Sequence, residues 1–392
     1  MTETADVVII GGGVIGASVA FHLAERRAGK ILLLEKAHLG AASSGKSGAI
    51  IRQYYSHALL TLMARHGLRM YRDFSDIVGG PPVFTHSGMV VVTDASGRAQ
   101  LEANVGMLAK LGVEAKMLSP TDLKALDARV SVKDDEVAAY EAEAGYCEAL
   151  QVVASFASAA RERGVDVREA TAATGLVLDG EKVAGVATPR GVISTRTVVL
   201  AAGGWSAALA NGAGVQIPVK ACRAQVALLR RPCDFGPAHP VFGDLANQIY
   251  FRPTHGEITH VGNVDPREES SAVDPDRYKE VADEEFAAEM REKIQRRYPA
   301  IDRGAGRGGY GALYSVTPDW QPIIDRLPGV EGAFCAAGFS GHGFKMAPAV
   351  GKLLAELVVD GRAACFDIHP LRASRFEEGE PFGGKTFAKV MG

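Results

Sequence analysis

Residues 6–35 read DVVIIGGGVIGASVAFHLAERRAGKILLLE. The opening run of β-branched residues predicts a buried strand, and it leads directly into a cluster of glycines. Residues 17–27 then predict a helix, and residues 31–34 predict a second buried strand that ends in Glu35. The stretch therefore predicts a strand–helix–strand unit, around which the rest of the chain is organised.

Three glycines of this stretch, Gly11, Gly13 and Gly16, have the spacing Gly-x-Gly-x-x-Gly. The first allows a tight turn, the second lets the backbone approach a pyrophosphate, and the third lets the helix lie close to the strand. The helix N-terminus offers free N–H groups to the phosphates. Glu35 falls where a carboxylate accepts hydrogen bonds from an adenosine ribose and repels a 2′-phosphate. The unit therefore predicts a dinucleotide-binding site.

Length and composition narrow the class of protein. The chain has 392 residues, enough for two domains or one large discontinuous domain, and 47% of them are hydrophobic, as in an ordinary globular core. A net charge of −3 predicts no nucleic acid or anionic membrane as a partner. Five scattered cysteines without a Cys-x-x-Cys pair predict neither disulfides nor a metal site. With no apolar run of transmembrane length and no signal peptide, we expect a cytoplasmic protein.

Several helices and strands can be placed between this unit and residue 217. Helices are predicted at 57–74, 99–111, 120–126 and 150–163, and strands at 88–93, 165–168, 173–178, 182–188 and 197–202. Residues 40–48 are nearly all small, so this loop either lies flat against a planar ligand or is a flexible surface loop. The strand at 197–202 ends in two glycines before Trp205, which predicts a second place where backbone approaches a bound group.

The middle and the end of the chain have different patterns. Residues 218–311 contain short, alternating strands at 224–229, 248–252 and 258–262 and one long helix at 276–297, a pattern typical of a sheet with one covered face. We expect this part to bring substrate groups. Residues 332–337 then predict a strand, 338–345 (GFSGHGFK) a glycine-rich loop, and 348–360 a helix that starts at Pro348. That helix N-terminus either stabilises negative charge on a reduced cofactor ring or the glycines serve only close packing.

Four segments occur together in one known family. They are 11–16 with Glu35, 49–52 (AIIR), 313–319 with 323–325 (LYSVTPD and IID), and 336–345 (AAGFSGHGFK). In these segments the chain resembles the flavin-dependent amine and amino-acid oxidoreductases, which include D-amino-acid oxidase, glycine oxidase and sarcosine oxidase. The resemblance is greatest to monomeric sarcosine oxidase and the sarcosine oxidase β-subunit group. It covers nearly the whole chain up to about residue 372.

The resemblance implies a fold of the α/β plus α+β type. A discontinuous Rossmann-type FAD-binding domain (1–80, 145–217 and 312–370) joins a substrate-binding domain with a mixed or antiparallel sheet (81–144 and 218–311), and a C-terminal tail follows (371–392). The resemblance implies FAD rather than NAD, and it implies that Arg52 and Lys345 hold a substrate carboxylate. A guanidinium and an ammonium can neutralise one carboxylate, the former through two parallel hydrogen bonds. Tyr250 and Tyr314 match aromatic positions of the family's substrate cavity.

The chain also departs from the family. The cysteine that sarcosine oxidase bonds to its flavin is replaced by Ala312, and residues 40–48 contain no histidine, so we expect non-covalent FAD. His260 takes approximately the place of a lysine that promotes the reaction with oxygen, which leaves oxidase and dehydrogenase both open. Gly45 and Ala49 stand where relatives place basic residues beside the flavin, and Lys46 is near enough to substitute.

The expected site residues fall into two groups. The substrate group consists of Arg52, Lys345, Tyr250, Tyr314 and His260. The cofactor group consists of Gly11, Gly13, Val14, Ile15, Gly16, Glu35, Lys36, Ser43, Ser44, Lys46, Ser47, Gly48, Ala202, Gly203, Trp205, Gly338, Gly341, His342, Gly343, Phe344 and Lys345.

The resemblance implies oxidative deamination or demethylation of a small, secondary amino acid. Hydride would pass to flavin N5, oxygen or another carrier would take the electrons, and the imine would hydrolyse. Two alternatives remain open. One is a 2-hydroxy-acid dehydrogenase of the same fold, with His260 or His342 as its base. The other is a flavoprotein subunit or assembly factor of a larger complex, with little activity alone.

Overall fold

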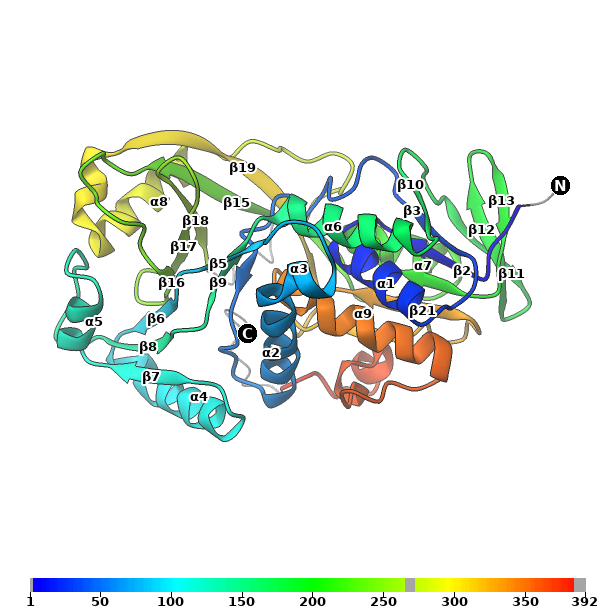
Figure 1. The fold of residues 1–392 in the computed structure, drawn as a ribbon, viewed down its shortest axis with the longest axis horizontal. Coiled ribbons are helices and arrows are strands. Elements are labelled where there is room, and N and C mark those ends of the chain that lie inside the picture. Colours follow the sequence, from blue (N-terminus) through cyan, green and yellow to red (C-terminus); the bar gives the residue numbers. More distant parts are fainter. Residues whose placement is uncertain (1–2, 265–271, 384–392) are drawn as a thin grey trace.

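The computed structural model describes residues 3–264 and 272–383 (Figure 1). Its first unit follows the prediction: β2 (Val7–Ile10) leads through the glycines into α1 (Val14–Glu25) and on to β3 (Ile31–Leu34). The two strands pair in parallel. Helix α1 begins at Val14 rather than at residue 17, because Gly13 in an extended conformation is its N-cap. The glycine cluster therefore ends directly at a helix N-terminus.

Six strands from distant parts of the sequence form the sheet of this half. Their order is β10 (Asp166–Arg168), β3, β2, β14 (Val198–Leu200), β21 (Ala333–Ala337) and β20 (Ile323–Arg326). The first five pair in parallel, and β20 runs antiparallel to β21. The four central strands are buried along their whole length, as in a parallel sheet that is covered on both faces. The predicted Rossmann-type architecture is confirmed.

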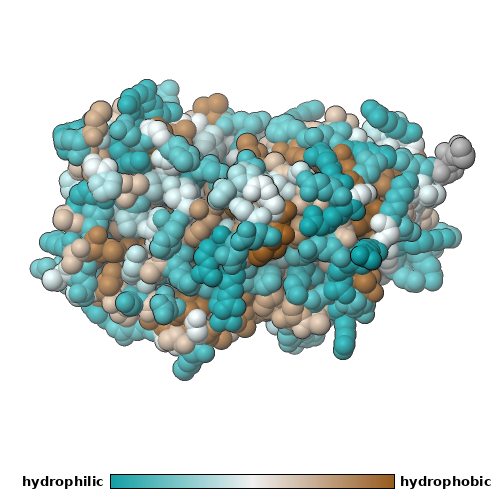
Figure 2. Space-filling view, viewed as in Figure 1, coloured by the Kyte–Doolittle hydropathy of each residue, from teal (hydrophilic) through white to brown (hydrophobic). Residues whose placement is uncertain are grey.

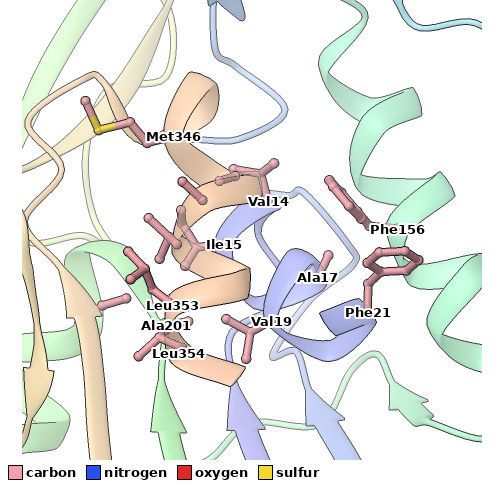
Figure 3. Packing of buried hydrophobic residues seen from close by; sticks show 14 of the residues in the cluster. Val14, Ile15, Ala17, Val19, Phe21, Phe156, Ala201, Met346, Leu353 and Leu354 are labelled. Carbon is pink, nitrogen blue, oxygen red and sulfur yellow. The ribbon is translucent and has the colours of Figure 1, made fainter. Parts of the chain in front are cut away.

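Four helices share the larger apolar core with this sheet: α1, α2 (Ala58–Arg72), α6 (Ala149–Glu162) and α9 (Gly343–Asp360). Figure 3 shows Phe21 of α1 facing Phe156 of α6, with their ring centroids 5.6 Å apart. A Cβ at Gly351 of α9 would lie 2.3 Å from the Ser18 hydroxyl, so a glycine is what lets α1 and α9 approach each other.

A smaller apolar cluster holds the other face of the six-stranded sheet. It contains residues of β12 (Lys182–Thr188), β13 (Gly191–Ser194) and α7 (Ser206–Gly212). These two strands form a four-stranded sheet with β1 (Glu3–Thr4) and β11 (Gly175–Asp179). On the outer face shown in Figure 2, hydrophilic side chains cover most of the surface, and apolar ones form small separate areas. The apolar side chains are thus mostly used between the layers.

An eight-stranded sheet forms the second half. Its order is β19 (Ala305–Val316), β15 (Lys220–Arg230), β18 (Ile258–Asn263), β17 (Ile249–Pro253), β16 (Val241–Asp244), β6 (Met89–Thr93), β8 (Val137–Glu141) and β7 (Ala115–Leu118). Neighbours are antiparallel except β16 and β6, so the expected mixed sheet is confirmed. Helices α8 (Glu284–Arg297) and α5 (Pro120–Leu126) share one core with it. The proposed division of the chain into two discontinuous domains stays a prediction.

The remaining elements lie between and beside these sheets. They are α3 (Phe74–Ile77), α4 (Arg98–Lys110), and a three-stranded sheet of β4 (Ile50–Ile51), β9 (Gly145–Cys147) and β5 (Phe84–His86). Strand β4 leads directly to Arg52, so this small sheet fixes where that side chain leaves the backbone.

The predicted helix at 276–297 is wrong in its first eight residues. Residues 276–283 are not helical and run beside β19, where Gly311 N donates to Glu280 O at 2.7 Å. A Cβ at Gly311 would lie 2.4 Å from Lys279 O, so the glycine makes room for this backbone. Pairing with a glycine-rich strand thus overrides helix propensity. Strand β19 was not predicted from the sequence, because it contains several glycines and glycine is depleted in strands.

The predicted start of the last helix at Pro348 is also wrong. Helix α9 begins at Gly343, so Pro348 lies inside it. A proline has no N–H to offer to the carbonyl four residues earlier, which is that of Phe344. The hydroxyl of Tyr71 on α2 donates to this carbonyl instead, at 2.6 Å. Proline is therefore tolerated here because a neighbouring helix replaces the missing donor.

We predict that Tyr71→Phe lowers the free energy of unfolding by about 1–3 kcal/mol, because it leaves the buried Phe344 carbonyl without a donor. Urea unfolding measures this. In a Pro348→Ala background the restored N–H should supply the bond, so the same substitution should then cost clearly less. An equal cost in both backgrounds would contradict the explanation.

Candidate functional site

A cavity of about 650 Å³ is lined by both halves of the molecule. This volume lies in the range of small-molecule and cofactor sites, roughly 300–1,000 Å³. Of the expected site residues, the cavity is lined by Gly11, Gly13, Val14, Ile15, Glu35, Lys36, Ser43, Ser44, Lys46, Ser47, Gly48, Arg52, Ala202, Gly203, Trp205, Tyr250, Tyr314, Gly341, His342, Gly343, Phe344 and Lys345. The structure thus brings together residues that are up to 334 positions apart in the chain (345 − 11).

The glycine cluster shapes one end of the cavity. Gly11 has a φ of +113°, and a Cβ there would lie 2.4 Å from Ala201 O, so no other residue fits. No side chain caps α1 at Gly13, although the Ser44 hydroxyl accepts a hydrogen bond from Val14 N at 2.9 Å. An exposed backbone beside a helix N-terminus suits an anionic phosphate.

Glu35 lies at the same end, immediately after β3. One carboxylate oxygen accepts from Gly12 N and the other from Ala37 N, both at 2.8 Å. A carboxylate has about four acceptor sites, so two of them stay available to ribose hydroxyls. The glycines and Glu35 therefore fit the adenosine and pyrophosphate of a dinucleotide.

Two buried cations lie at another part of the cavity wall. Arg52 is 4% exposed and Lys345 is 6% exposed. The Arg52 guanidinium donates to Tyr54 O and lies over the Tyr55 ring, 4.2 Å from its centroid. Burial, together with the positive charge of Arg52, holds the pKa of Lys345 well below its usual range. Among the described residues, no carboxylate forms an ion pair with Lys345.

Local structure fixes both side chains. Glu141 at the end of β8 is buried and accepts from Gln53 N at 2.8 Å and from Tyr54 N at 3.0 Å, so it anchors the segment after Arg52. Lys345 lies in the first turn of α9. Its neighbour His342 is buried, and burial and the two cations lower the pKa of its imidazole far below the usual value. The imidazole is therefore neutral at neutral pH.

Aromatic rings form the wall beside these cations. Tyr250 on β17 lies over Gly262, where a Cβ would come within 2.3 Å of its ring. Tyr314 on β19 lies over Gly341, where a Cβ would be 2.9 Å from its Cζ. Small residues under both rings thus allow each to reach the cavity.

Three expected residues do not line the cavity. Gly16 supports the turn, since a Cβ there would lie 1.9 Å from Gly11 O, and Gly338 packs against Thr317. His260 is on β18, edge-on to Tyr310 at 6.1 Å, and burial followed by the charge of Arg252 lowers its pKa to about 4. A neutral imidazole cannot supply the positive charge of a lysine.

Lys46 has a different environment from the one expected. Its ammonium donates to Glu280 at 2.6 Å, to the Tyr278 hydroxyl at 3.0 Å and to Gly311 O at 3.1 Å. The lysine is thus tied to the segment beside β19.

Sequence reasoning missed several lining residues: Met89, Asn263, Pro275, Asp276, Tyr278, Glu280 and Trp320. Four of them lie in the segment beside β19, most of which was predicted as helix. The run Val-Asp-Pro-Asp at 273–276 was the available signal, because proline and aspartate favour a break.

A Rossmann-type sheet with a glycine fingerprint, an acid after the second strand and a cavity shared with a second sheet define a dinucleotide-dependent oxidoreductase. The particular family follows from a comparison with known families: the model of the FAD dependent oxidoreductase (DAO) family matches residues 6–357. The chain belongs to this family, and FAD is its cofactor.

The individual relatives have low sequence identity to this chain. The chain is 28% identical to the sarcosine oxidase subunit beta of an Arthrobacter species, over 95% of this chain and 91% of that protein. It is also 28% identical to the 4-methylaminobutanoate oxidase (formaldehyde-forming) of Paenarthrobacter nicotinovorans, of which it spans 45%. Among solved structures, the L-proline dehydrogenase of P. horikoshii superposes with a TM-score of 0.89 at 26% identity, over 97% of this chain and all of that one.

Two further features are absent from residues 3–264 and 272–383. None of the helices there combines the length and the apolar character needed to cross a bilayer. No group of three or more metal-binding side chains was found in the same residues. A cytoplasmic location stays a prediction.

We predict that Lys345→Met raises the unfolding temperature of the FAD-free protein, because it removes a buried ammonium. The folded-state pKa of Lys345 is lowered, so the unfolded chain binds the proton more tightly and folding at low pH carries the full penalty. The penalty shrinks as pH rises toward the ordinary lysine pKa of about 10.4. Thermal unfolding from pH 6 to 10 should therefore show a gap between variant and wild type that narrows with pH. A gap that widens would contradict the assigned environment.

Proposed function

We propose that the protein uses non-covalently bound FAD to oxidise a small, secondary amino acid by deamination or demethylation. One observation carries the proposal: Arg52 and Lys345 are both buried in the wall of the cavity that the glycine fingerprint also lines. A buried ammonium without a carboxylate partner is unstable, so Lys345 favours a ligand that brings a negative charge, and the neighbouring positive charge of Arg52 adds to this preference. The names of the relatives, sarcosine oxidase subunit beta and L-proline dehydrogenase, refer to small secondary amino acids, which have such a carboxylate.

In this proposal each residue has a distinct task. Arg52 binds the carboxylate through two hydrogen bonds, and Lys345 adds a third and restores charge balance. Tyr250 and Tyr314 limit the space around the rest of the substrate. The same cations disfavour a protonated amine nearby, so the amine enters the reaction with its lone pair available. When bound, FAD supplies the hydride acceptor.

The identity of residue 312 supports non-covalent binding of FAD. Ala312 lines the cavity at the position where sarcosine oxidase has its flavin-linked cysteine, and it cannot form a bond. The segment beside β19 holds the FAD in place instead, because Pro275, Asp276 and Tyr278 all line the cavity. Asp276 pairs with Lys36 and accepts from the Trp205 indole at 3.1 Å, which ties this segment to the dinucleotide half.

We predict that acid precipitation of the purified protein releases all of its yellow colour to the supernatant. The physical reason is that unfolding removes every contact that holds FAD. Absorbance at the flavin band of pellet and supernatant measures the partition, and a flavin-linked enzyme serves as a control. Colour that stays in the washed pellet would show a covalent bond.

We predict that Arg52→Ala and Lys345→Ala each raise KM steeply while FAD content is unchanged. Removing one charged partner of a buried carboxylate should cost on the order of 2–4 kcal/mol of binding. Steady-state kinetics and the ratio of flavin to protein absorbance measure the two effects. Arg230→Ala, an exposed arginine paired with Glu257, is the matched control and should behave like wild type. Unchanged KM in both site variants would refute this orientation of the substrate.

Anaerobic bleaching of the flavin tests the substrate class. Sarcosine or L-proline should bleach it, and L-lactate should not, because the cavity offers no base at His260. Bleaching by lactate and by no amino acid would favour the hydroxy-acid alternative, with neutral His342 as its base.

A second candidate function is that of a subunit in a larger assembly. It is favoured by the subunit beta relative, of which this chain spans 91%. Failure of every amine to bleach the flavin, together with a co-purifying protein, would support it.

A further inference from the structure

The C-terminal segment folds back onto the wall of the cavity. Arg375 is fully buried and makes a two-point contact with Asp319, from Nε to Oδ2 at 2.8 Å and from a terminal nitrogen to Oδ1 at 3.0 Å. The same guanidinium also donates to Gln321 O at 2.8 Å. A planar fork of this kind fixes both partners in orientation as well as in distance. The tail thus holds a turn that lies more than 50 residues earlier in the chain (375 − 319 = 56).

Asp319 is the centre of this turn. Its Oδ1 accepts from Gln321 N at 3.0 Å and lies 3.1 Å from the Thr317 hydroxyl, and its Oδ2 accepts from Phe382 N at 2.9 Å. Two separate points of the tail, Arg375 and Phe382, therefore converge on one carboxylate. Losing the guanidinium would leave that carboxylate buried without its charge partner.

Trp320 lies between the residues that this network holds. It has a φ of +61°, a conformation that costs energy for a bulky side chain and persists only where the surroundings impose it. Its indole is buried, lines the cavity and packs against Cys222, Val316 and Tyr314. The tail thus determines the placement of an aromatic ring next to Tyr314.

The tail also contacts the segment that follows Arg52 in the chain. The Phe382 ring lies 4.2 Å from His57, which caps α2 directly after the Arg52 segment. On the side of the turn, Thr317 packs against Gly338, and Ser340 N donates to Ser315 O at 2.8 Å. The tail therefore connects the start of α2 to the glycine-rich loop that leads to Lys345.

We propose that Arg375 is a positioning residue which, through Asp319, holds Trp320 in the cavity wall and so sets the size of acid that the cavity accepts. The inference rests on the proposed function, since it assigns a size filter to the same carboxylate site. It also gives a role to residues 371–383 of the predicted C-terminal tail.

The test is a titration of the FAD-loaded protein with two acids that have no amine and cannot be oxidised. Butanoate has the shape of sarcosine, and cyclopentanecarboxylate has the shape of proline; flavin absorbance reports binding. We expect Arg375→Met to raise Kd for butanoate about tenfold and to change the ratio of the two Kd values. Trp320→Leu should change that ratio in the same direction. The double variant should be no worse than Trp320→Leu alone, because both act through one ring.

Two further variants separate positioning from general stability. Arg297→Met removes another buried arginine, one paired with Asp244 and Glu136 away from the cavity. It should lower the unfolding temperature and leave both Kd values unchanged. Arg375→Lys keeps the charge and should recover part of the binding; it carries the test if the methionine variant does not fold.

The outcomes are distinct. Wild-type Kd values and ratio in Arg375→Lys and Arg375→Met overturn the inference, and so do fully additive effects of Arg375→Met and Trp320→Leu. Failure of the wild type itself to bind either acid refutes the proposed function instead.

Discussion

Two positive charges buried side by side are the constraint on which the site depends. Arg52 and Lys345 come from opposite ends of the chain, and both are almost inaccessible to water. Such a pair raises the free energy of the folded state unless a negative charge is nearby. Glu141 is close enough for its charge to interact with that of Arg52, and it also accepts hydrogen bonds from the backbone N–H groups of Gln53 and Tyr54. No carboxylate in the part of the chain that the structure describes forms an ion pair with Lys345. We therefore propose that the arrangement is a binding site for an acid, kept at the expense of stability.

The rest of the fold brings Arg52 and Lys345 close to each other. Arg52 directly follows strand β4, which its pairing with β9 holds in place, and Lys345 lies in the first turn of α9. The start of α9 lies close to α2 because Gly67 of α2 leaves room for Lys345 O; a Cβ there would be 2.0 Å from it. Tyr71 of the same helix donates a hydrogen bond to the Phe344 carbonyl, which Pro348 cannot do because it has no N–H. The position of Lys345 and the packing of α2 against α9 are thus coupled through a few backbone atoms.

Much of this could be predicted from the sequence. The glycine fingerprint, Glu35 and the loop before Lys345 carry local signals, because a turn or a close approach demands specific residue types. Contacts that depend on tertiary structure carried no such signal. The segment 276–283 has a helix-like composition but pairs with a glycine-rich strand, and the tail gives no hint that Arg375 meets Asp319. His260 matched a family position in sequence, yet it does not line the cavity, although the strand register places it on the same sheet face as Tyr250.

The most direct test of the buried cation pair is calorimetry of butanoate binding in two buffers with different heats of ionisation, at about pH 9, between the lowered and the ordinary pKa of lysine. A carboxylate that completes the pair must raise the lowered pKa of Lys345, so binding should take up protons in the wild type and none in Lys345→Met. Tight binding without proton uptake, or no binding at all, would contradict the account.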